Sequence, residues 1–234
     1  MDDADLLKQV SQLRDAGRSP KQIARVLGMP PSAVARLVRT VAAQTQAEAG
    51  EPAVVGCWVN AGWSRGLTVD PSRGWVDQAP EPDGVGGLVS VLVARRHRWD
   101  RVSVCGYLAD VYCLGVKNAF GPDVKTELEL SRFLPDYFAS YPDGWQDAPG
   151  DLAADLVFGA VEYARGLGFE PHVDFAPAAG HLGSWAGPSA ITFGRDGKPF
   201  YISGPYDNPS KVMKTLQSTA GSPPAFNFLT GIEG

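Results

Sequence analysis

The stretch "QIARVLGMPPSAVARLV", residues 22–38, decides the fold of the first part of the chain. Apolar residues recur at helical spacing on both sides of Gly28, which predicts two helices joined by a short turn. Gly28 can adopt the positive φ angle that such a turn requires. Ala24 is small enough to let the two helices cross closely. We therefore expect a helix–turn–helix pair in this stretch.

The residues before this stretch predict a third helix and a clear start for the second. Leucine and valine recur at helical spacing over residues 6–13, and Gly17 is a helix stop. Ser19 and Pro20 are typical of the cap and the first position of a helix. The last helix is expected to begin near Ser32. Three helices with one small core follow from this pattern.

Residues 20–41 resemble the helix-turn-helix of bacterial regulators, resolvases and sigma-factor DNA-binding regions, because their small, glycine and apolar positions agree with it. The resemblance implies that the last helix lies in the major groove of double-stranded DNA. There an arginine can bind guanine through two hydrogen bonds. The residues expected to face the bases are Ser32, Ala33, Arg36 and Arg39, and those expected to hold phosphates are Lys21, Arg25 and Arg18.

The charge distribution favours the same partner. From Lys8 to Arg39 the chain holds seven basic residues and one acidic residue, a net charge of +6, although the whole chain is at −5. A basic segment on an acidic protein is typical of contact with a polyanion. The alternative is a protein-interaction or dimerisation module with a solvated basic face. Because one small reading unit binds DNA weakly, we expect a homodimer.

The bulk composition predicts a cytoplasmic globular protein. The chain has 234 residues, of which 44% are hydrophobic and 20% charged. We find no apolar run near the roughly 20 residues that span a bilayer, and no secretory pattern at the start. Cys57, Cys105 and Cys113 are odd in number and irregularly spaced, which argues against a disulfide framework. No membrane partner is therefore expected.

Residues 1–44 are expected to form the helical module and the polar residues 45–52 a linker, which leaves residues 53–234 as a larger domain. Strand patterns interrupted by a pair of helical patterns predict an α+β domain with a mainly antiparallel sheet. Its strands are expected at residues 53–60, 87–97, 100–116 and 171–177, with a hairpin within 189–207. Its helices are expected at residues 125–141, at 151–166 and after residue 208.

Cys113 raises the question of an enzyme. The chain order Cys113, His172, Asp174 resembles cysteine hydrolases, in which a histidine activates the thiol and a carboxylate orients the histidine. However, Cys113 is expected to close a strand, whereas papain-like cysteines open a helix. The simpler interpretation is that Cys113, like Cys105, is a small buried apolar residue. With His181 these residues could also ligate zinc, but their spacing is not compact, so we predict neither metal nor cofactor.

A polar group at the end of the same expected strand allows two interpretations. A carboxylate in an apolar strand needs a partner, so Asp110 is expected to pair with Lys117 or an arginine. Alternatively, the strand end forms a pocket for a small polar ligand, helped by the turn "SGPYDNP" and the start of the last helix. The residues of that pocket would be Asp110, Lys117, Asn118, His172 and His181.

Together these patterns predict a DNA-binding transcription regulator whose larger domain serves ligand sensing, oligomerisation or partner binding. The alternative is a cysteine-dependent hydrolase or transferase centred on Cys113 and His172, with the helical module used for docking.

Overall fold

A computed structural model describes residues 3–48, 51–79, 86–98 and 100–229. It divides the chain into two compact units: an N-terminal unit, Met1–Pro52, and a body, Ala53–Gly234. Each unit is described by itself. No helix in the described part of the chain is long and apolar enough to cross a membrane.

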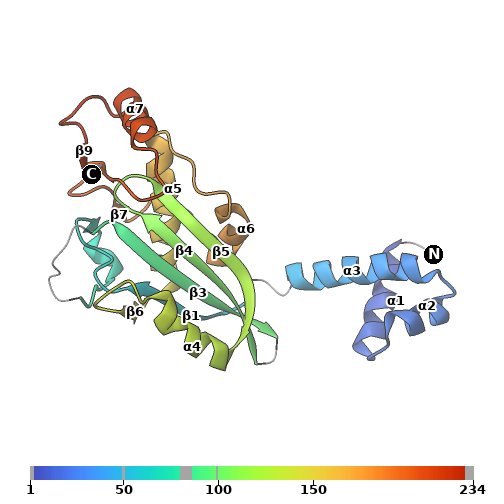
Figure 1. Cartoon of the computed structure of the whole chain (residues 1–234). Coiled ribbons are helices and arrows are strands. Elements are labelled where there is room, and N and C mark those ends of the chain that lie inside the picture. Colours follow the sequence, from blue (N-terminus) through green and yellow to red (C-terminus); the bar gives the residue numbers. More distant parts are fainter. Residues whose placement is uncertain (1–2, 49–50, 80–85, 99, 230–234) are drawn as a thin grey trace. The chain divides into compact units, whose positions relative to one another are not determined.

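The N-terminal unit consists of three helices, α1 (Asp3–Asp15), α2 (Pro20–Leu27) and α3 (Pro31–Glu48) (Figure 1). Side chains from all three bury one small core, as the apolar spacing predicts. Its buried members are Val10, Ile23, Ala24, Val34 and Val41. Helix α3 extends beyond the expected end of the module into residues 45–48, because glycine and proline are absent until residue 50.

Local sequence signals fix both ends of α2. The Ser19 side chain accepts a hydrogen bond from the Gln22 backbone N–H, and the Gln22 side chain accepts one from the Ser19 backbone N–H, which forms a capping box. At the other end Gly28 has φ 62° and ψ 27°, and its N–H donates to the Ala24 carbonyl. The predicted start and stop of this helix are thereby confirmed.

The body is built on a five-stranded antiparallel sheet with the strand order β5-β4-β3-β1-β6. The strands are β1 (Val54–Asn60), β3 (Leu88–Arg98), β4 (Arg101–Asp110), β5 (Gly115–Thr126) and β6 (Trp145–Asp147). Helix α4 (Glu127–Tyr137) packs on one face and α5 (Gly150–Gly166) on the other (Figure 1). The predicted α+β class with a mainly antiparallel sheet is confirmed.

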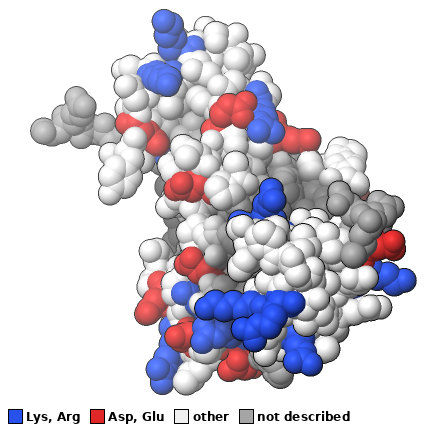
Figure 2. Space-filling view, turned by 90° about the vertical axis from the view of Figure 1, so that its right-hand side faces the viewer, with Lys and Arg blue, Asp and Glu red and all other residues white. Residues whose placement is uncertain are grey.

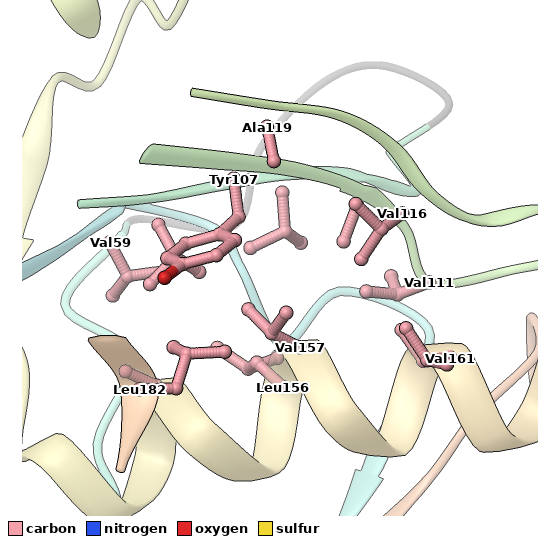
Figure 3. Close-up of a cluster of buried hydrophobic side chains, with 14 of the residues drawn as sticks. Val59, Tyr107, Val111, Val116, Ala119, Leu156, Val157, Val161 and Leu182 are labelled. Carbon is pink, nitrogen blue, oxygen red and sulfur yellow. The ribbon is translucent and has the colours of Figure 1, made fainter. Parts of the chain in front are cut away.

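The larger core lies between the sheet and α5. Figure 3 shows Tyr107 and Val116 of the sheet pointing towards Leu156 and Val157 of the helix. The Tyr107 hydroxyl donates to the Ala178 carbonyl at 2.7 Å, so the one polar atom of this ring is satisfied. Burial of this face stabilises the sheet through the apolar area that it removes from water.

The opposite face of the sheet holds a smaller core under α4. Leu92 and Val104 of the sheet pack there with Leu130 and Phe138. Strand β4 therefore buries apolar side chains on both faces, as its alternation predicts for a central strand.

The expected single strand over residues 100–116 is wrong at its second half. Strand β4 ends at Asp110, a turn follows at residues 111–114, and β5 starts at Gly115 and returns antiparallel to β4. The Asp110 carboxylate closes this turn by accepting hydrogen bonds from the backbone N–H groups of Tyr112 and Cys113 at 2.9 and 3.0 Å. The turn is itself buried, so its apolar residues continue the strand pattern without a visible break.

Two further strand predictions fail. The expected strand at residues 171–177 is a turn followed by the short helix α6 (Phe175–Ala179). The expected hairpin within 189–207 is reduced to a tight turn with one antiparallel bridge, Arg195 to Lys198, and its two runs do not pair as strands. Instead β7 (Ile191–Thr192) pairs with β2 (Thr68–Val69), and β8 (Phe200–Ile202) pairs in parallel with β9 (Asn227–Leu229).

The expected helices are present, with two shifted ends. Helix α4 is shorter than the expected span 125–141, because Thr126 and Glu129 form a capping box that starts it at Glu127. Helix α5 confirms the span 151–166 to within one residue. The last helix, α7 (Pro209–Thr219), begins after Asn208, whose side chain accepts from the Lys211 N–H at 3.0 Å.

Candidate nucleic-acid interface

Helix α3 has one buried and one exposed face. Ser32, Arg36 and Arg39 are spaced by four and three residues, which places them on the same side of a helix. All three are exposed. Val34 and Val41 point to the opposite side and are buried in the core. Ala33 is half-buried between the two faces, so it offers less surface than the other three predicted contacts.

The cations expected to hold phosphates lie on α2 and just before it. Lys21 and Arg25 are four residues apart on one side of α2, and both are exposed. Arg18 precedes the Ser19 cap and is also exposed. On the face drawn in Figure 2, Lys and Arg side chains gather side by side in the lower half.

One basic residue of the N-terminal unit has a structural role instead. Arg14 is half-buried, and its guanidinium donates to the Val38 carbonyl of α3 at 3.3 Å. This bond joins α1 to α3. Arg39 differs, because its Nε donates to the Ala35 carbonyl one turn earlier in its own helix and its side chain is exposed.

In the described part of the chain Cys113 forms no hydrogen bond with a histidine. It lies in the buried turn after β4 and packs with apolar side chains that include Leu216 and Phe226. Burial, and then the nearby Asp110 and Asp207 carboxylates, raise the pKa of its thiol. A thiol that is both buried and protonated is a poor nucleophile. The expectation that Cys113 lies on a strand with Cys105 is wrong.

His172 and Asp174, the expected partners of Cys113, are exposed and interact with each other. The Nδ1 atom of His172 lies 3.4 Å from the Asp174 carboxylate. The backbone N–H of His172 donates to the Val116 carbonyl, which fixes the start of this loop beside β5. The structure thus contains a local histidine–carboxylate pair rather than a cysteine-centred triad.

The five residues expected to form a polar pocket do not all come together, because His181 lies apart from Asp110. His181 contacts the Ser103 carbonyl at 2.9 Å, near the start of β4, whereas Asp110 is the last residue of that strand. Seven residues of strand separate these points, roughly 23 Å. Burial lowers the pKa of His181, which favours its neutral form.

Lys117 pairs with Asp207 rather than with Asp110. Its Nζ atom lies 2.8 Å from the Asp207 carboxylate. The same carboxylate accepts from the Gly204 N–H at 2.8 Å. The turn "SGPYDNP", expected to bind an anion, is therefore occupied by a carboxylate of the chain itself. Asp110 stays buried at the turn after β4.

Asn118 is exposed beside a surface groove of about 320 Å³ between the sheet and α4. Aromatic side chains that include Phe120 and Tyr141 line this groove. A second hollow, of about 310 Å³, lies near the start of α5 and includes Trp75 and Asp151. Neither of these two hollows is lined by a cysteine or a histidine. Within the described ranges no three His, Cys, Asp or Glu side chains gather as a metal site would require.

The sequence prediction missed one charged feature of the body. Residues 95–101, "RRHRWDR", include four arginines and one aspartate; residues 95–98 end β3, Arg101 begins β4, and residue 99 lies outside the described residues. We call this segment the basic hairpin. Arg98 and Arg101 are exposed, whereas Arg95 is buried and donates from Nε to the His181 carbonyl at 2.6 Å. The run of arginines in the sequence could have predicted this feature, but the negative net charge of the body drew attention away from it.

Comparisons with known proteins identify no relative of this chain. No protein-family model matches the sequence, and the searches of curated proteins and of solved structures find no match.

Proposed function

We propose that the chain binds double-stranded DNA through α3 and acts as a transcription regulator. The single observation that carries this proposal is the exposed row of Ser32, Arg36 and Arg39, on the helix that follows the tight turn at Gly28. Side chains in such a row can reach base edges in a major groove about 12 Å wide. The body then serves oligomerisation, ligand sensing or partner binding.

The chemistry of the row supports base contacts, and the chemistry of α2 supports phosphate contacts. The planar guanidinium groups of Arg36 and Arg39 suit the N7 and O6 acceptors of guanine. Lys21 and Arg25 are exposed on the preceding helix, which in this type of module crosses the DNA backbone. The homodimer fits this assignment, because two copies would double a small contact surface.

The test is the loss of DNA binding in Arg36→Ala/Arg39→Ala. Duplexes of about 30 base pairs are enriched from a random-sequence library with the full-length chain, and affinity is measured by fluorescence anisotropy. Each arginine that contacts a guanine contributes about 1–3 kcal/mol, so the double variant should bind at least tenfold more weakly. The stoichiometry at saturation should be two chains per duplex.

A matched control separates the site from net charge. Lys211 and Lys214 are exposed on α7 of the body, so Lys211→Ala/Lys214→Ala removes the same charge elsewhere. This variant should bind DNA as the unmodified chain does. Equal affinity of the Arg36→Ala/Arg39→Ala variant and the unmodified chain would refute α3 as the reading helix.

A further inference from the structure

We propose that the basic hairpin is a second contact of this chain with DNA and binds backbone phosphates through Arg98 and Arg101. This inference rests on the proposed function of α3. The basic charge of the hairpin contrasts with the acidic charge of the body. Residues 51–234 hold 14 basic and 21 acidic residues, a net charge of −7, yet four of those basic residues are arginines within residues 95–101.

The strand register places two of these arginines in an unfavourable arrangement. Arg98 of β3 lies directly opposite Arg101 of β4. Like charges opposite each other destabilise a strand pair. Both side chains are exposed, and neither forms a salt bridge with another described residue. A local conflict without a compensating contact is typical of a functional position.

Asp100 lies within the hairpin, is exposed and forms no salt bridge with Arg98 or Arg101 in the described part of the chain, and two further carboxylates are engaged by other partners. Glu127 pairs with Arg96 at 2.9 Å. Glu129 accepts from the backbone N–H and the hydroxyl of Thr126 at 2.7 and 3.0 Å, and it attracts Arg101 only at longer range. The positive charge of the hairpin tip is therefore only partly neutralised by its surroundings. A bound anion would neutralise the rest.

The covalent connection to the N-terminal unit favours DNA as that anion. The backbone N–H of Arg96 donates to the Ala53 carbonyl at 2.8 Å, so the chain enters the body beside the hairpin. Only residues 49–52 join Ala53 to Glu48, the last residue of α3. Once α3 is bound to a duplex, hairpin binding to the same duplex is intramolecular.

Phosphate contacts of the hairpin would add to those proposed for Lys21 and Arg25 on α2. They carry no sequence information, but they supply much of the affinity of a DNA-binding protein and position its reading element. Two exposed arginines at the tip of a hairpin suit this task, because a guanidinium binds phosphate oxygens through two hydrogen bonds. The ligand of this site is thus the sugar–phosphate backbone of double-stranded DNA.

The test uses Arg98→Ala/Arg101→Ala in the full-length chain, with the enriched duplexes described above. Affinity should fall about tenfold, and the slope of log affinity against log salt should decrease by about 2, because two phosphate contacts are lost. Arg98→Lys/Arg101→Lys keeps both charges and should keep most of the affinity. The thermal unfolding temperature of the alanine variant should be unchanged or higher, since a like-charge pair is removed.

The outcomes distinguish this inference from the function on which it rests. Unchanged affinity and salt slope in Arg98→Ala/Arg101→Ala, with binding lost in Arg36→Ala/Arg39→Ala, would overturn the hairpin contact and keep the reading helix. The same loss in Lys211→Ala/Lys214→Ala would overturn it as well, because net charge alone would then explain the effect. Binding that depends on the hairpin but not on α3 would overturn the proposed function and, with it, the shared DNA surface.

Discussion

Lys117 Nζ lies 2.8 and 2.9 Å from the two carboxylate oxygens of Asp207, ninety positions later in the chain. The two side chains are only 22% and 10% exposed. This pair fastens the loop before α7 to the beginning of β5, which lies next to the turn that holds Cys113. It is a long-range tie between the sheet and the last helical segment of the body.

Asp207→Asn should destabilise the body, because it leaves a largely buried ammonium group without its charged partner. Loss of such a partner costs about 2–3 kcal/mol. The unfolding temperature should fall by roughly 5–10 °C in a thermal scan followed by circular dichroism. Glu127→Gln is the matched control, since its pair with Arg96 is exposed and should change stability by less than about 1 kcal/mol. Equal effects of the two variants would contradict this ranking.

All three cysteines should resist alkylation in the native chain. Cys57, Cys105 and Cys113 are buried, and burial raises the pKa of Cys57 to about 12 and that of Cys105 to about 11. Iodoacetamide at about pH 8 should leave the native thiols unmodified and react with all three in urea, because only an accessible thiolate reacts. Mass spectrometry of the peptides locates each adduct. Rapid native modification of Cys113 would instead support the enzyme alternative.

The helical module could be predicted from sequence because its signals are local. Ser19 caps α2 by accepting a hydrogen bond from a residue three positions later. Gly28 ends this helix eight positions after Pro20. The turn after β4 could not, because its partners lie far away in the chain. Cys113 packs against Leu216, and the Tyr112 hydroxyl donates to the Arg65 carbonyl at 2.7 Å. Periodicity cannot reveal a turn whose residues are apolar and mostly buried.

The candidate site residues also fall into a group that the sequence could predict and a group that it could not. Arg36 and Arg39 could be placed on an exposed face because helical spacing relates them directly to the core residue Val34. The polar pocket at the end of β4 was inferred from residue chemistry, without knowledge of which distant side chains meet there. Lys117 instead found its carboxylate in Asp207, a pairing that only the tertiary fold defines.

Asp110 should make the stability of the body depend on pH in the opposite sense to an ordinary salt-bridged carboxylate. Burial raises its pKa to about 6, although backbone hydrogen bonds and Lys117 act in the other direction. An unfolded aspartate has a pKa of about 3.9. Between these values the folded state binds more protons than the unfolded state, so this residue's contribution falls as pH rises from about 4 to 6 and is level above that.

Asp110→Asn isolates this effect, because an asparagine Oδ1 can still accept from the Tyr112 and Cys113 amides but does not titrate. Urea unfolding at intervals from about pH 4 to pH 7 should show the variant gaining stability relative to the unmodified chain as pH rises. Asp110→Ala removes the acceptor as well and should cost about 2 kcal/mol even at pH 7. A constant difference between Asp110→Asn and the unmodified chain across the pH range would show that Asp110 is ionised in the folded state throughout. The buried turn would then have to stabilise a full negative charge through its backbone amides and Lys117.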